Sequence, residues 1–91
     1  MDILLVDDDE TLRQSLVMLL QSEGHSVTEA VDGEKALEKA RMHYFDLVLC
    51  DVRMPGIDGI ETLKQLKVQC PDLKVIMLTS HGDEYLAPSL D

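Results

Sequence analysis

The stretch VLCDVRMPG, residues 48–56, decides how this chain folds. An apolar run ends abruptly at Asp51, and a Met-Pro-Gly turn follows shortly afterwards. A short, continuous apolar run is typical of a strand that is buried on both faces, as in a parallel sheet. Such a strand would present the Asp51 carboxylate at its end, where the capping of a helix does not explain it.

Three further segments have the composition of strands, and segments with helical spacing separate them. We expect strands at residues 3–6, 27–30, 47–50 and 75–78, of which 27–30 is the least apolar and therefore an edge. Apolar residues at helical spacing mark the three helices: Leu12, Leu16, Leu19 and Leu20; Ala36, Leu37 and Ala40; Ile60, Leu63 and Leu66. The alternation predicts an α/β fold, a doubly wound parallel sheet of the form βαβαβαβ.

The ends of the predicted helices carry recognisable start and stop signals. Asp9 or Glu10 favours the start of the first helix and Gly24 its end. Asp32 is the expected N-cap of the second helix, and Pro71 ends the third.

Length and charge restrict the functions that are open to the chain. Its 91 residues suit one small domain, and 45% hydrophobic residues argue for a folded core. The net charge of −10 disfavours direct binding to nucleic acid or to an anionic membrane. No apolar run reaches the ~20 residues of a membrane span, so we expect a cytoplasmic protein. Cys50 and Cys70 lack metal-site spacing and are expected to be buried free thiols.

Polar side chains follow three of the predicted strands. Asp7, Asp8 and Asp9 follow the first, Asp51 the third, and the Thr79-Ser80 pair the fourth. Ligand sites of doubly wound sheets lie outside the carboxyl ends of the strands, so these groups are expected to converge. Clustered carboxylates repel unless a cation neutralises them, and Mg²⁺ prefers oxygen ligands. Helix capping explains the aspartate triplet alone equally well.

In its motifs the chain resembles the receiver domain of bacterial two-component response regulators, from residue 3 to about residue 83. The resemblance is carried by LVDDD at residues 5–9, Asp32-Gly33 with Ala36-Leu37, DLVLCDVRMPGIDG at 46–59, and VIMLT at 75–79. The wording RMPGIDG also looks like receivers of the nitrogen-regulation type. The resemblance implies a flavodoxin-like fold and a role in two-component signal transduction.

The resemblance also implies a role for each site residue. Asp51 would accept a phosphoryl group from a sensor histidine kinase and form an acyl phosphate. Asp8 would bind Mg²⁺ directly, Asp7 would act mainly through a metal-bound water, and Asp51 and the backbone carbonyl of Arg53 would be further ligands. Thr79 would be the switch hydroxyl that moves to the phosphoryl oxygen. The domain would not be an enzyme beyond self-phosphotransfer and autodephosphorylation.

Pro55 and Gly59 would shape the loop after the acceptor, again by resemblance. The chain departs from the family pattern at its end. Members have five strands in the order 2-1-3-4-5, whereas this sequence stops after the fourth, giving 2-1-3-4 without the fifth strand and last two helices. The lysine that follows the fifth strand is missing with it, so we predict slow or absent phosphorylation. Residues 1–83 then form a shortened receiver and 84–91 a divergent tail.

The shortening also predicts an exposed strand. Residues 75–78 would form an edge whose apolar side chains are left wet, and such an edge invites pairing with another chain. We therefore expect a homo-oligomer, most simply a dimer through strand four or the tail. The alternative function is a phosphorylation-independent interaction module on the same scaffold. A magnesium-dependent phosphohydrolase is disfavoured, because no second acid or base and no substrate pocket are visible.

Overall fold

A four-stranded parallel sheet organises the chain. The computed structural model describes residues 1–52, 54 and 56–78. The elements are β1 (Asp2–Val6), α1 (Glu10–Ser22), β2 (Ser26–Ala30), α2 (Gly33–Met42), β3 (Leu47–Asp51), α3 (Gly59–Gln69) and β4 (Lys74–Leu78). The strands lie in the order β2-β1-β3-β4, and all pairs are parallel. This arrangement confirms the predicted flavodoxin-like fold, with β2 at an edge.

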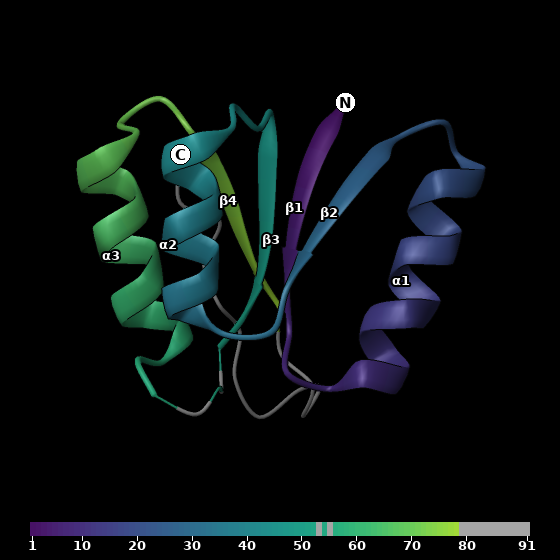
Figure 1. Cartoon of the computed structure of the whole chain (residues 1–91), viewed down its shortest axis with the longest axis horizontal. Coiled ribbons are helices and arrows are strands. Elements are labelled where there is room, and N and C mark those ends of the chain that lie inside the picture. The colour runs from purple at the N-terminus through teal and green to yellow at the C-terminus, as the bar shows by residue number, and fades with distance from the viewer. Residues whose placement is uncertain (53, 55, 79–91) are drawn as a thin grey trace.

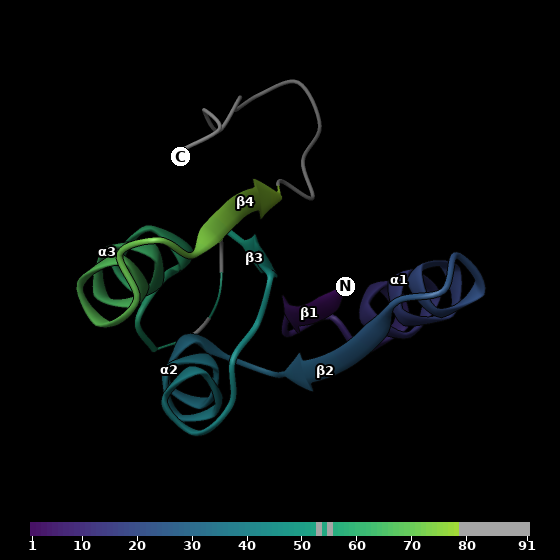
Figure 2. The ribbon, with the colours of Figure 1, turned by 90° about the horizontal axis from the view of Figure 1, so that it is seen from above.

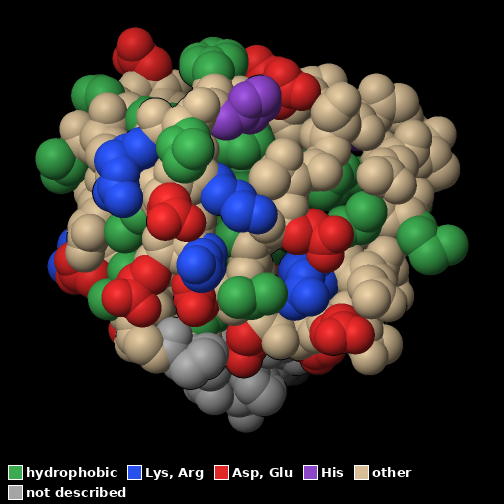
Figure 3. Space-filling view, viewed as in Figure 1, with side chains coloured by type: hydrophobic (Ala, Val, Ile, Leu, Met, Phe, Trp, Pro, Cys, Tyr) green, Lys and Arg blue, Asp and Glu red, His purple; other side chains and the backbone are tan. Residues whose placement is uncertain are grey.

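The helices divide unequally between the two faces of the sheet. Helices α2 and α3 lie side by side over one face, and α1 alone covers the other (Figures 1 and 2). In the view of Figure 3, acidic side chains are scattered over the surface with lysine and arginine side chains among them. The basic residues seen from this side therefore form no separate basic patch.

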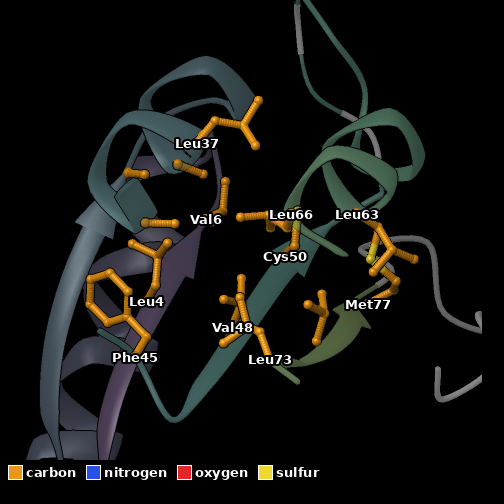
Figure 4. Close-up of a cluster of buried hydrophobic side chains, with 14 of the residues drawn as sticks. Leu4, Val6, Leu37, Phe45, Val48, Cys50, Leu63, Leu66, Leu73 and Met77 are labelled. Carbon is orange, nitrogen blue, oxygen red and sulfur yellow. The ribbon is translucent and has the colours of Figure 1, made fainter. Parts of the chain in front are cut away.

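Most of the core lies between the sheet and the α2/α3 pair. Leu4 and Val6 of β1 and Val48 and Cys50 of β3 are fully buried and point toward these helices (Figure 4). Leu66 of α3 closes the centre of this cluster and is also fully buried. Side chains alternate between the faces of a strand, so Ile3 and Leu5 face α1 instead.

Helix α1 covers its face of the sheet thinly. Its one buried residue is a charged one, Arg13. Met18 and Leu19 are 72% and 57% exposed. The predicted apolar stripe of this helix is therefore only partly in contact with the sheet. No helix in the described ranges is long and apolar enough to cross a membrane.

Strand β4 is the outer strand of the sheet on the side away from β2. The expectation that all four of its apolar side chains stay wet is wrong for Val75 and Met77, which are 1% and 7% exposed. These two residues point toward α3 and join the core. Ile76 points the other way and is 42% exposed, and Leu78 is half-buried.

Aspartates begin all three helices. The Asp9 side chain accepts from the Leu12 N–H (3.1 Å), and Asp32 accepts from the Lys35 N–H (2.8 Å), as predicted. Asp58 caps α3 by the same contact, with the Glu61 N–H (2.9 Å). Each cap satisfies a backbone donor that the helix cannot satisfy itself.

Candidate metal centre

Three carboxylates meet at the carboxyl ends of the two central strands. Asp7 directly follows β1, and Asp51 ends β3, whose Cys50 is paired in register with Val6. One carboxylate oxygen from each of Asp7, Asp8 and Asp51 lies within 4.8 Å of the others. This convergence is what the aspartates at the strand ends predicted. Hard oxygen donors so close together suit a divalent cation such as Mg²⁺.

The three aspartates differ in their surroundings. Asp7 and Asp51 are 1% and 5% exposed, whereas Asp8 is exposed. An Asp7 oxygen accepts a hydrogen bond from the Asp9 N–H at 2.9 Å. The Asp9 side chain does not belong to the cluster, because it caps α1. Capping therefore explains one member of the triplet and leaves two for the site.

Burial dominates the ionisation of Asp7. It raises the pKa of this carboxyl above its usual range, because water no longer solvates the charged form. The neighbouring charges of Asp51 and Asp8 raise the pKa further, and the Asp9 N–H partly opposes them. A cation at the cluster would reverse this balance by favouring the ionised carboxylates.

The neighbouring thiol is not available as a ligand. Cys50 is fully buried on the α2/α3 face, and burial together with the charges of Asp51 and Asp7 raises its pKa to about 12. Its side chain therefore stays neutral, as expected for a buried free thiol. Cys70 is only half-buried, which corrects the expectation that both thiols are in the core.

Sequence reasoning missed Arg13, which reaches the site from α1. Its Nη1 donates to the backbone carbonyl of Asp7 at 2.8 Å, and its Nε donates to Glu29 Oε1 of β2 at 2.8 Å. The sequence carried no signal for this contact, because a charged residue on an amphipathic helix is typical of its solvated face.

The start of α3 lies directly against the end of β3. The Gly59 N–H donates to the Val52 carbonyl at 2.9 Å. A Cβ at Gly59 would lie 2.1 Å from the Asp51 carbonyl oxygen and 2.7 Å from the Val52 Cα. Only a glycine allows this approach, which agrees with the expectation that Gly59 shapes this region.

The N-termini of α2 and α3 also lie close to each other. A Cβ at Gly33 would lie 2.0 Å from Thr62 Oγ1 and 2.8 Å from Ile57 Cγ1. Thr62 is completely buried, and its hydroxyl donates to the Asp58 carbonyl at 2.8 Å. The close approach of Gly33 to Thr62 could not be read from the sequence, because it depends on how the two helices are placed.

Three predicted contributors lie outside the described residues: Arg53, Pro55 and Thr79. The described part of the predicted site is therefore Asp7, Asp8, Asp51 and Gly59. The structure brings the three aspartates together, and their roles remain predictions.

Comparison with known proteins agrees with this arrangement. The sequence model of the family "Response regulator receiver domain" matches residues 3–90. The transcriptional regulatory protein ZraR of Klebsiella oxytoca is 48% identical over 81 residues, which are 89% of this chain and 18% of ZraR. FixJ of Bradyrhizobium diazoefficiens is 44% identical over 85 residues, 93% of this chain and 42% of FixJ. The chain thus spans less than half the length of these relatives.

Solved structures show the same similarity. The response regulator TrrA of Thermotoga maritima, in complex with Mg²⁺-BeF, superposes with a TM-score of 0.84 at 40% identity, covering 93% of this chain and 76% of that one. A complex of the histidine kinase ThkA with TrrA gives a TM-score of 0.86 at 37% identity, covering 94% and 74%.

Fold and site together define a flavodoxin-like α/β protein with an acidic cluster at the carboxyl ends of its central strands. With the matches above, the chain belongs to the response regulator receiver domain family of two-component signalling.

Proposed function

We propose that this chain is a phosphoacceptor module in which Asp51 receives a phosphoryl group from a sensor histidine kinase. The observation that carries the proposal is the convergence of Asp7, Asp8 and Asp51 within 4.8 Å. The similarity to TrrA, whose structures include a complex with Mg²⁺-BeF and one with a histidine kinase, supports both the metal and the partner.

The surroundings of the aspartates support distinct roles. Asp8 is exposed and would bind Mg²⁺ directly. Asp7 is buried and shares one oxygen with the Asp9 N–H, which suits contact through a metal-bound water. The Arg53 carbonyl as a ligand and Thr79 as the switch hydroxyl complete the proposal.

The reaction is a phosphoryl transfer to a carboxylate. An Asp51 oxygen would form the new P–O bond while the bond from phosphorus to the histidine nitrogen of the donor breaks. Bound Mg²⁺ supplies charge neutralisation for the phosphoryl oxygens. The Asp51 carboxylate would receive the group at the end of β3, and hydrolysis of the acyl phosphate would return it to its starting form. The module is in this sense not an enzyme with an external substrate.

We further propose that the 91-residue chain is phosphorylated slowly. The sequence has no lysine or arginine after Lys74. Two of the described lysines are engaged elsewhere: Lys39 Nζ donates to the Glu29 carbonyl (2.6 Å), and Lys67 Nζ donates to the Leu73 carbonyl. Lys74 begins β4 and therefore lies at the opposite end of the sheet. None of these three lysines would therefore assist Asp51.

Intact-mass spectrometry tests both statements. The chain is incubated with a small-molecule phosphodonor and Mg²⁺, beside Asp51→Asn. We expect slow addition of one phosphate to the wild type and none to the variant. Equal labelling of Asp51→Asn would remove Asp51 as the acceptor, and rapid labelling of the wild type would overturn the proposed impairment alone.

The exposed edge of the sheet favours the second candidate, an interaction module that works without phosphorylation. Ile76 lies on the outer strand β4 and is 42% exposed. In this proposal β4 or the tail of one copy pairs with a second copy to form a dimer. Light scattering at micromolar concentration is expected to give a dimer for the wild type and a monomer for Ile76→Lys. A monomeric wild type would exclude the proposed dimer.

Other assignments remain part of the proposal. The RMPGIDG wording supports a receiver of the nitrogen-regulation type, with residues 1–83 as the domain and 84–91 as a tail. We propose a cytoplasmic location and no direct contact with nucleic acid, in keeping with the net charge of −10.

A further inference from the structure

Arg13 occupies a position that packing alone does not explain. It is the only residue of α1 that is buried, with 9% of its surface exposed. Burying a guanidinium is unfavourable unless its charge and donors are matched, and an aliphatic side chain would fill the same space more favourably. Leucines of the same helix, such as Leu19, are left largely exposed. The polar contacts of Arg13 are therefore the reason for its burial.

One of the polar contacts of Arg13 reaches the Asp7–Asp8 peptide, where backbone hydrogen bonds also hold the chain. The Asp7 N–H donates to the Ala30 carbonyl of β2 at 3.1 Å, which fixes the peptide before Asp7. Arg13 Nη1 holds the Asp7 carbonyl, which belongs to the peptide that leads into Asp8. With the Asp9 N–H on the Asp7 carboxylate, the backbone is held on both sides of the first two site residues.

Glu29 orients the guanidinium. Its carboxylate binds Arg13 Nε at 2.8 Å and is 44% exposed at the rim of the sheet. Since the guanidinium is planar, a bond at Nε fixes the direction in which Nη1 donates. The same carboxylate also balances the charge of Arg13, so the arginine reaches the cluster as part of a neutral pair.

We propose that Arg13 is a positioning residue for the metal centre, fixing the Asp7–Asp8 peptide through its hydrogen bond to the Asp7 carbonyl, with Glu29 as its orienting partner. The inference rests on the proposed Mg²⁺ site. It gives α1 a role in metal affinity although none of its side chains is proposed as a ligand.

Two Arg13 variants separate positioning from electrostatics. Calorimetric titration with Mg²⁺ is expected to give an affinity about 10-fold weaker for Arg13→Gln, the size typical of residues that orient metal ligands. Arg13→Lys should also be weaker, because an ammonium cannot satisfy both partners in the fork geometry. A purely electrostatic role predicts the opposite: tighter binding for Arg13→Gln, which removes a cation near the carboxylates, and no change for Arg13→Lys. Arg41→Gln, a variant of an exposed arginine on α2, is the control and should bind like the wild type.

A second pair of variants covers the case in which Arg13 substitutions prevent folding. Glu29→Gln keeps an acceptor for Nε but removes the charge, whereas Glu29→Ala removes both. Positioning predicts nearly wild-type Mg²⁺ affinity for Glu29→Gln and a loss of roughly 3-fold for Glu29→Ala, smaller than for Arg13→Gln because Glu29 acts through the arginine. Equal losses for the two Glu29 variants would contradict positioning.

Amide spectra without Mg²⁺ supply a readout that overall stability does not move. The Asp8 and Asp9 amide signals should shift or broaden in Arg13→Gln and Glu29→Ala while those of β4 stay in place. Wild-type chain that fails to bind Mg²⁺ would remove the metal proposal and this inference together. Wild-type binding with unchanged affinity in the Arg13 and Glu29→Ala variants would overturn this inference only.

Discussion

The two faces of the sheet differ in how much apolar surface they bury. The α2/α3 face contains nearly all of the buried apolar cluster, including Leu4, Val48 and Leu66. The α1 face buries Ile3 and Leu5 of β1, whereas Met18 and Leu19 of α1 are exposed to solvent. Stability is therefore concentrated on one side of the sheet.

Both faces contribute to the site, but by different means. Helix α3 holds Asp51 in place, because Gly59 lets the first turn of the helix lie against the backbone of Asp51 and Val52. Helix α1 sets Asp7 and Asp8 through the polar contact of Arg13. Asp51 is thus held by close packing, and Asp7 and Asp8 are held by hydrogen bonds. Perturbing one face should affect stability, and perturbing the other should affect ligand affinity.

A matched pair of leucine substitutions should show the largest difference between the faces. Leu66→Ala removes a fully buried side chain and should lower the free energy of unfolding by about 3 kcal/mol. Leu19→Ala on α1, where the side chain is 57% exposed, should change it by less than about 0.5 kcal/mol. Urea unfolding measures both. Similar losses would show that α1 is packed as firmly as α3.

Gly59→Ala should have the next largest effect. The added Cβ would meet backbone atoms of Asp51 and Val52, which cannot rotate away, so α3 has to shift. We expect a loss of about 2 kcal/mol in urea unfolding. Val68→Ala on the same helix, at a position that is 83% exposed, is the control and should be nearly neutral. An unchanged free energy of unfolding in Gly59→Ala would mean that α3 does not hold the end of β3.

Asp7→Asn should raise the free energy of unfolding, by less than the two preceding substitutions lower it. The folded chain raises the pKa of Asp7 above its unfolded value, so between these two pKa values the folded state binds more protons and stability falls as pH rises. At neutral pH without Mg²⁺, the ionised carboxylate is therefore destabilising. Asn keeps an acceptor for the Asp9 N–H without the charge.

The variant should then be more stable than the wild type at about pH 7 in chelator, and the difference should shrink below the unfolded pKa of 3.8, where both states are protonated. Asp72→Asn, at an exposed position, serves as the control in the same urea titrations. A less stable Asp7→Asn at neutral pH would contradict the unfavourable ionisation of Asp7.

Much of the fold could be predicted from the sequence, because the strands are short apolar runs with sharp ends. The run before Asp51 and the run before Asp7 predicted buried strands, the family resemblance implied that they are neighbours, and their carboxylates meet as expected. The sequence could not show that Val75 and Met77 are covered while Ile76 is not, because that depends on the reach of α3. Arg13 was missed for a similar reason: a charged residue on an amphipathic helix looks like part of its solvated face until β2 is placed beside it.

The central claim is that Asp7, Asp8 and Asp51 form one Mg²⁺ site, and a Mg²⁺ titration followed by amide spectra of the wild type tests it most directly. We predict saturable shifts of the Asp8, Asp9 and Val52 signals, with no change near Leu73 at the opposite end of the sheet, and no saturable shifts in Asp51→Asn. Shifts that do not saturate, or that are spread evenly over exposed acidic residues, would contradict the claim.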